Sequence, residues 1–382
     1  MQRTGFARLP LHYGRAPRYL IVRMQKLAKE IVTIIVDEYG SDEFLRRVSD
    51  PFWFQALGCV LGYDWHSSGV TTVLTGILKQ ALSPEQHGIA VCGGKGKASR
   101  KTPMEIGEVG EEFGFSSDNI EVLRHASRMS AKVDNIAVQA GYQLYHHAFF
   151  LADDKKWAVV QQGMCTQDRT ARRYHWLSDN VRRFVVEPHN AIVGDVKRDT
   201  VLDMTAEISE GCRKASVDLA KEEPKRLIRM FQSARPEFQK PLSEWLPIDA
   251  GTAWKEYSFD YLSMPRSVNW KTLREVYEFQ PRSYEELLGI GGVGPATVRG
   301  LALVAEVIYG EKPSWKDPVK YSFAYGGKDG VPYPVDRKVM DESIQILKQA
   351  VEDARIGSKD KMRSLRKLTQ FVPDNMPAQE TD

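Results

Sequence analysis

A glycine-rich turn between two helical stretches constrains this chain more than any other feature of its sequence. Residues 290–301 read IGGVGPATVRGL and follow a short helical stretch that Ser283 and Glu286 can cap. Pro295 suits the first turn of the second helix, because the N–H that it lacks would have no partner there. Such a hairpin points backbone N–H groups and a helix N-terminus at one spot, a geometry suited to a nucleic-acid phosphate. The alternative is an ordinary tight turn between packed helices.

The same stretch, residues 283–303, resembles the helix-hairpin-helix element of DNA repair and replication proteins. In that family an apolar helix end precedes a Gly-x-Gly hairpin, and a second helix begins with small residues. The resemblance implies binding to the DNA backbone with little sequence preference, because phosphate contacts do not read bases. It assigns DNA contact to Gly291, Gly292, Val293, Gly294, Ala296, Thr297 and Arg299.

The charge of the chain is nearly balanced, with 53 Lys and Arg against 50 Asp and Glu, a net charge of +3. Attraction to DNA must therefore come from local basic clusters. One cluster contains Lys95, Lys97 and Arg100, which we expect to lie along a DNA backbone, and two more occur within residues 169–183 and 355–367. A solvated surface is the alternative for each of them.

Several classes of protein are not expected. The four cysteines lie far apart and form no C-x-x-C pair, which argues against a zinc knuckle or a disulfide framework. The apolar run Ile31–Val36 is too short to span a membrane and no signal peptide precedes it, so we expect a cytoplasmic protein without a membrane partner. The GGKGK stretch at 93–97 fails the spacing of a nucleotide-binding loop, so no nucleotide cofactor is expected.

The pattern of the chain predicts an α+β fold in two parts. Residues 1–190 read as a mixed α+β domain and residues 200–370 as an all-α domain that contains the hairpin, with a disordered tail at 371–382. Residues 187–199 read as the linker between the two parts. Within the first part, residues 132–144 read as a helix, and residues 146–151 and 157–162 as two strands of a hairpin.

The N-terminal part is rich in residue types that serve in catalytic sites. Two strands joined by a tight turn place their far ends side by side, so His146 or His147 should lie near Gln161 or Gln162. Only one of the two histidines can join a site, because neighbouring residues point to opposite faces of a strand. The alternative for each histidine is a hydrogen-bonded ring in the core.

Carboxylate and imidazole groups of this kind can hold Mg²⁺ or Mn²⁺, and a nearby cation can stabilise a phosphodiester in a nuclease. We expect the metal ligands to be Asp64, His66, Asp134 and His147. Gln162 and His175 are further candidates for metal or acid–base roles, with Lys132 and Arg173 steadying phosphate charge.

Asp336 carries a second hypothesis. It follows the Gly/Pro-rich stretch 326–334 downstream of the hairpin, which resembles base-excision glycosylases, where such an aspartate stabilises the sugar cation after base flipping. Ala296 stands where the bifunctional members have a lysine nucleophile, so lyase chemistry is not expected. Asp336 is otherwise a helix cap. A non-catalytic DNA-binding scaffold is the third hypothesis.

Over its full length the chain resembles the domain-of-unknown-function 763 family of archaea and thermophiles. Residues 50–69, 131–134, 157–164 and 171–176 carry this resemblance, which implies no mechanism. The positions of the candidate residues in the folded protein can therefore distinguish the hypotheses. Convergence of Asp64, His66, Asp134, His147 and Gln162 in one cleft favours the nuclease, and scatter into separate cores favours the glycosylase or the scaffold.

Overall fold

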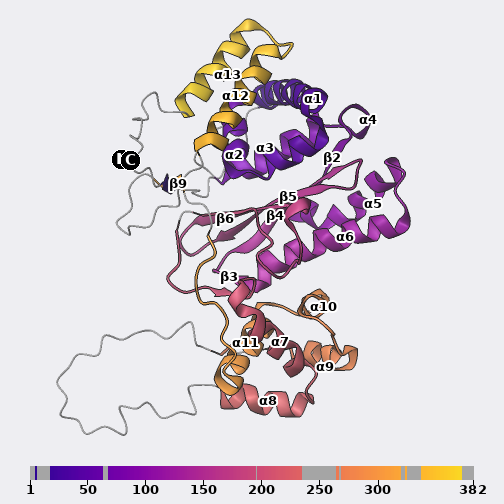
Figure 1. The fold of residues 1–382 in the computed structure, drawn as a ribbon, viewed down its shortest axis with the longest axis vertical. Coiled ribbons are helices and arrows are strands. Elements are labelled where there is room, and N and C mark those ends of the chain that lie inside the picture. The colour runs from indigo at the N-terminus through magenta and orange to yellow at the C-terminus, as the bar shows by residue number, and fades with distance from the viewer. Residues whose placement is uncertain are drawn as a thin grey trace, which may run out of the picture.

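The fold is built around a central antiparallel sheet with helices on both faces, which confirms the predicted α+β class (Figure 1). The computed structural model describes residues 5–6, 18–62, 68–194, 196–234, 264–265, 268–319, 323–324 and 337–371. Both faces of the sheet are covered, so its middle strands are buried along nearly their whole length. Within the described residues no helix combines the length and apolar character needed to cross a bilayer.

The central sheet has five strands in the order β2-β4-β5-β6-β7. Its strands are β2 (Ile89–Lys95), β4 (Gln143–Ala152), β5 (Trp157–Cys165), β6 (Thr170–Leu177) and β7 (Ala191–Gly194). The predicted hairpin is confirmed as β4 and β5, with His146 opposite Gln162 and His147 opposite Gln161. Two smaller sheets pair β1 (Gly5–Phe6) with β9 (Phe323–Ala324) and β3 (Val138–Gln139) with β8 (Leu202–Asp203).

One face of the sheet carries helices from both ends of the chain. They are α1 (Arg18–Val48), α2 (Pro51–Val60), α3 (Gly69–Ala81), α4 (Pro84–His87), α12 (Arg337–Asp353) and α13 (Ser358–Phe371). Gly40 interrupts α1 with φ 86°, a backbone conformation that glycine adopts readily. Leu347 and Val351 of α12 and Leu368 of α13 are buried in the core that α1 and α2 form.

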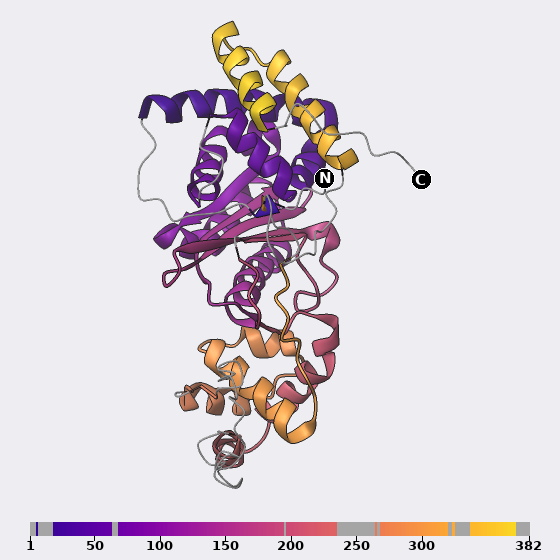
Figure 2. The same ribbon diagram turned by 90° about the vertical axis from the view of Figure 1, so that its left-hand side faces the viewer.

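The other face carries two helices, and a helical module lies beyond them. The helices are α5 (Thr102–Glu112) and α6 (Ser117–Lys132). The module consists of α7 (Glu210–Ala220), α8 (Pro224–Ser233), α9 (Trp270–Phe279), α10 (Tyr284–Gly289) and α11 (Pro295–Tyr309). Figures 1 and 2 place this module at the opposite end of the molecule from α12 and α13.

Short helical turns complete the chain path. A π-helical turn, η2 (Val133–Ala137), follows α6 directly. Three 3₁₀ turns are η1 (Gly96–Lys101), η3 (Ser178–Asn180) and η4 (Glu207–Ser209).

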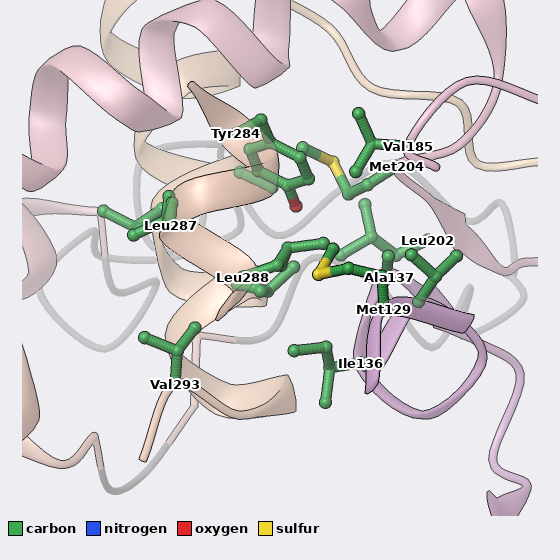
Figure 3. Close-up of a cluster of buried hydrophobic side chains, with 14 of the residues drawn as sticks. Met129, Ile136, Ala137, Val185, Leu202, Met204, Tyr284, Leu287, Leu288 and Val293 are labelled. Carbon is green, nitrogen blue, oxygen red and sulfur yellow. The ribbon is translucent and has the colours of Figure 1, made fainter. Parts of the chain in front are cut away.

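The helical module and α6 share one hydrophobic core. Figure 3 shows Leu288 and Val293 of the module facing Met129 and Ile136, side chains of α6 and η2. Leu288 is fully buried and Val293 is 3% exposed. The glycine hairpin is thus held against the α+β part of the protein by apolar packing.

Three parts of the structure differ from the sequence-based expectation. Residues 132–144 do not form one helix, because η2 and β3 follow α6 and the chain turns back into β4. The expected linker at 187–199 contains β7, the edge strand that pairs with β6. The predicted all-α part is divided in space, because α12 and α13 pack with α1 and α2 and not with the module. The predicted tail beyond residue 371 lies outside the described residues.

Leu288→Ala tests the packing that joins the module to α6. We expect it to lower the free energy of unfolding by roughly 2–5 kcal/mol, because the fully buried leucine leaves a cavity at the junction. Urea denaturation followed by circular dichroism measures this change. Val122→Ala is the control, because Val122 is 66% exposed and its loss should change stability by no more than about 0.5 kcal/mol. Equal effects of the two substitutions would contradict the expected role of Leu288.

Candidate nucleic-acid interface

Two helices, α10 and α11, flank the glycine hairpin as the sequence predicts. The backbone N–H of Glu286 donates to Ser283 Oγ at 3.1 Å, so the predicted cap is confirmed. The Glu286 carboxylate accepts from the N–H of Arg282 at 2.8 Å, one residue earlier than in a capping box. Val298 N donates to Gly294 O at 3.1 Å and closes the first turn of α11.

Glycine is required at the tip of this hairpin for two reasons. Gly292 has φ 82°, which side chains rarely adopt, and a Cβ there would lie 2.4 Å from Thr272 Oγ1. Gly291 faces open space, and both glycines are exposed. The contact with Thr272 also brings the N-terminus of α9 next to the hairpin.

The two edges of the hairpin backbone are bonded differently. The N–H groups of Gly291, Gly292, Gly294 and Ala296 have no hydrogen-bond acceptor among the described residues. The carbonyl groups next to them are hydrogen-bonded to the α+β part. Lys132 Nζ donates to Ile290 O at 3.0 Å and to Val293 O at 3.3 Å. Gln139 Nε2 donates to Pro295 O at 2.9 Å.

Not every predicted DNA-contact residue offers its side chain. Val293 and Thr297 are 3% and 2% exposed, so their side chains do not face a ligand. The main-chain groups of Val293 are also engaged, because its N–H donates to Ile290 O at 3.4 Å and its carbonyl accepts from Lys132. Arg299 lies one turn into α11 with its guanidinium 5.5 Å from the centre of the Trp315 ring. The predicted basic residues Lys95, Lys97 and Arg100 are exposed, at the end of β2 and in η1. Lys95 Nζ lies 5.8 Å from the centre of the Tyr145 ring.

A buried polar cluster lies between the sheet and α6. Asp134, on η2, is fully buried and accepts hydrogen bonds from Gln161, His189 and, at 2.9 Å, Trp176 Nε1. Gln161 Oε1 lies 2.7 Å from His147 Nδ1, and Ser127 Oγ lies 3.0 Å from His147 Nε2. Each of these groups has a partner, so the cluster is a satisfied network.

A second buried polar cluster lies on the opposite face of the sheet, towards α2 and α3. Gln162 donates to Ser68 O at 2.9 Å and accepts from Thr71. Arg173 Nε donates to His175 Nε2 at 2.9 Å, and the Arg173 guanidinium lies 4.8 Å from the centre of the Phe54 ring. This second cluster therefore contains three of the predicted catalytic residues.

Arg173 lacks the acid partner that its neighbour has. Arg172 forms a buried ion pair with Asp317 at 2.7 Å. Arg173 is equally buried but has no carboxylate partner among the described residues, and its Nη2 has no hydrogen bond there. Burial lowers the pKa of Arg173 to about 9. An unpaired buried cation of this kind is costly to a fold.

The predicted catalytic residues therefore do not gather at one place. Asp134 and His147 lie on the α6 face, and Gln162, Arg173 and His175 on the other, because neighbouring residues of a strand point to opposite faces. Lys132 joins neither cluster and binds the hairpin. Asp64, His66 and Asp336 lie outside the described residues.

The described residues do not form the metal site that the sequence predicts. In the described part of the chain no three His, Cys, Asp or Glu side chains are arranged to hold a metal ion. The Asp134 carboxylate already accepts three N–H donors, and both ring nitrogens of His147 are engaged. Asp134 and His147 thus do not fit a metal without rearrangement of their hydrogen bonds.

Sequence reasoning missed the partners of Asp134. His189 lies in the stretch expected to be a linker, and the predicted catalytic residues include Gln162 but not Gln161. The available signal was a lone polar residue, His189, two positions before an apolar run of strand type, Ala191–Gly194. Trp176 gave no such signal, because a tryptophan on a buried strand reads as core.

Comparison with known proteins identifies the family. A model of the family described as "Protein of unknown function (DUF763)" matches residues 5–335. The match covers most of the chain, so the protein belongs to this family. No curated protein and no solved structure matches it. The resemblance to the domain-of-unknown-function 763 family is confirmed, and membership of this family implies no mechanism.

The buried histidines predict that acid destabilises the fold. Burial lowers the pKa of His146 to about 3 and also lowers the pKa values of His147 and His175. Below about pH 6.5 these histidines bind protons in the unfolded chain but stay neutral in the folded protein. The free energy of unfolding is therefore highest above pH 6.5 and decreases as the pH falls. For His146 alone, stability should drop by about 1.5 kcal/mol between pH 6.5 and pH 5.

Urea titrations of the wild type and His146→Gln at the two pH values measure this loss. The variant should lose less stability on acidification than the wild type does. His125→Gln is the control, because the His125 side chain is 47% exposed. An identical pH dependence in the wild type and His146→Gln would show that His146 is not held neutral by burial.

Proposed function

We propose that the protein binds DNA through the phosphate backbone, with the hairpin at residues 290–297 as the contact surface. The observation that carries the proposal is the row of four N–H groups at Gly291, Gly292, Gly294 and Ala296, for which the described part of the chain offers no acceptor. Backbone donors that converge at the start of a helix suit an anion, and a phosphate has the required charge and acceptor oxygens.

The surroundings of the hairpin support an anionic ligand. The N-termini of α9 and α11 both lie beside Gly292, and the partial positive charges of two helix ends add at this place. Lys271, in the first turn of α9, has an 86% exposed side chain. Backbone binding of this kind predicts little sequence preference and an affinity that falls steeply with salt.

Gly291→Glu tests the contact. Gly291 has open space around its Cβ position and no positive φ, so the hairpin should keep its shape while a carboxylate enters the proposed phosphate site. We expect the affinity for a labelled 20-base-pair duplex to fall by roughly 10-fold or more, measured by fluorescence anisotropy. Gly76→Glu adds the same charge to α3, on the far side of the sheet, and should bind as the wild type does. Unchanged binding by Gly291→Glu would remove the basis of the proposal.

Metal-dependent cleavage of DNA is a second proposal, and one observation favours it. Arg173 is a buried cation without an acid partner in the described structure. It lies on the same face of the sheet as Gln162, whose side chain donates to Ser68 O. Ser68 directly follows the stretch that contains Asp64 and His66. A guanidinium beside the reacting group can stabilise the negative charge that develops on a phosphodiester during cleavage.

Supercoiled plasmid tests this second proposal. Nicking is expected with Mg²⁺ or Mn²⁺ and should stop on addition of EDTA, while Asp64→Ala should abolish it and leave DNA binding intact. Cleavage that survives EDTA would argue against metal chemistry. Alkali-labile sites on a panel of damaged oligonucleotides, lost in Asp336→Ala, would instead favour the glycosylase hypothesis, and no product in either assay would leave a binding protein.

A further inference from the structure

The turn η1 and the end of strand β2 carry a cluster of exposed cations. Lys95 is the last residue of β2, an edge strand of the central sheet, and Lys97, Arg100 and Lys101 follow within η1. All four residues are exposed. No acidic residue occurs between residues 95 and 104. Positive charge is therefore concentrated on one short segment of the surface.

The described residues do not neutralise this charge. None of the four cations forms an ion pair with a described carboxylate. The next acid along the chain, Glu105, is already engaged, because its carboxylate accepts from Lys79 Nζ and from Gly93 N–H, both at 2.6 Å. Like charges that are held together without a counter-charge repel one another and destabilise the folded state. A bound polyanion relieves this repulsion.

The backbone of this segment has a conformation that glycine makes possible. Gly93 has φ 92°, and a Cβ there would lie 2.3 Å from His147 O and 2.4 Å from Thr102 Oγ1. Gly96, the first residue of η1, has φ 62°. Ser99 Oγ donates to Gly96 O at 2.7 Å, and Thr102 Oγ1 donates to Ser99 O at 2.8 Å. The cations thus lie on a turn that is fixed against the sheet, so a ligand meets them already in place.

Two of the four cations lie on the same edge of η1. Lys97 and Arg100 are three residues apart, and in a 3₁₀ helix such residues eclipse one another at about 6 Å along the axis. Phosphates of one DNA strand follow one another at about 3.4 Å along the duplex axis. Side chains as long as lysine and arginine can therefore reach two phosphates of the same strand from these positions.

The residues between the cations favour a polyphosphate over a lipid surface. Ala98 and Ser99 separate Lys97 from Arg100, so η1 contains no large apolar side chain. Segments that bind at a membrane surface combine basic residues with Trp, Phe or Leu, because burial of apolar area contributes much of their affinity. Contact with a nucleic-acid backbone requires only charge and reach.

We propose that η1 is a second contact surface for the DNA backbone, on which Lys97 and Arg100 bind two phosphates of one strand and Lys95 and Lys101 flank them. This inference rests on the proposed binding of DNA and deepens it, because it adds a contact that does not use the glycine hairpin. The contact depends on charge, and it reads no bases.

The experiment removes the two central charges in the full-length chain. Lys97→Gln with Arg100→Gln is compared with Arg23→Gln with Lys26→Gln, which removes one arginine and one lysine from exposed positions, also three residues apart, on α1. Fluorescence anisotropy measures affinity for a labelled 20-base-pair duplex at several NaCl concentrations. We expect the η1 variant to bind roughly 10-fold more weakly, with a slope of log K against log salt that is shallower by about 1.8, or about 0.9 for each lost contact. The α1 variant should stay within about 2-fold of the wild type.

A charge-exchanged variant separates charge from shape. Lys97→Arg with Arg100→Lys keeps both charges and should bind as the wild type does, because phosphates are contacted through charge. If this variant binds as weakly as the glutamine variant of η1, the exact side chains and not their charges are needed, and the proposal is overturned. All variants should unfold at the wild-type temperature, measured by circular dichroism, because the substituted side chains are exposed.

Two further results would overturn the proposal. Equal weakening by the η1 and α1 glutamine variants would show that only the total charge of the protein matters. Binding to phosphatidylserine vesicles in place of DNA, lost in the η1 variant, would show that the cluster serves a lipid surface.

Comparison with Gly291→Glu separates this inference from the proposed function. If the η1 variant binds DNA weakly and Gly291→Glu binds normally, the hairpin contact fails and the η1 contact stands. The reverse result removes the η1 contact and keeps the hairpin. A wild type that does not bind the duplex at any salt concentration would remove both.

Discussion

One buried carboxylate, that of Asp134, organises the part of the molecule where sheet and helical module meet. A polar group removed from water must find hydrogen-bond partners, and Asp134 accepts from Gln161 on β5, Trp176 on β6 and His189. The π-helical turn η2 places the carboxylate at these donors. Turns of this type often occur where function demands a departure from regular structure.

Residues on either side of Asp134 in the chain contact the glycine hairpin. Lys132 comes immediately before η2 and binds two hairpin carbonyls. Ile136, within the turn, faces Val293 in the shared core (Figure 3), and Gln139 follows as a donor to Pro295. The hairpin therefore has its carbonyl side fixed by the α+β part, while the N–H groups of Gly291, Gly292, Gly294 and Ala296 have no acceptor in the part of the chain that the structure describes.

The polar residues on the two faces of the sheet differ in how completely they are hydrogen-bonded. On the α6 face the network around Asp134 is saturated with partners, as expected of a group whose work is structural. On the other face Arg173, beside His175, has one N–H donor without a hydrogen bond and no carboxylate partner among the described residues. Side chains with perturbed pKa values and unused hydrogen-bond donors occur at functional sites more often than fully hydrogen-bonded side chains do. The face of the sheet towards α2 and α3 is therefore the better place to look for any chemistry of this protein.

Local patterns in the sequence were enough to predict the α+β class, the β4–β5 hairpin, the Ser283 cap and the glycine turn. Each depends on residues close together in the chain, where periodicity, capping and turn chemistry act directly. Tertiary structure alone decided which polar residues meet, that His189 joins Asp134, that Lys132 serves the hairpin, and that α12 and α13 return to α1 and α2. These contacts join residues far apart in sequence, so they follow from the burial of whole surfaces and from strand register, which no short stretch of residues encodes.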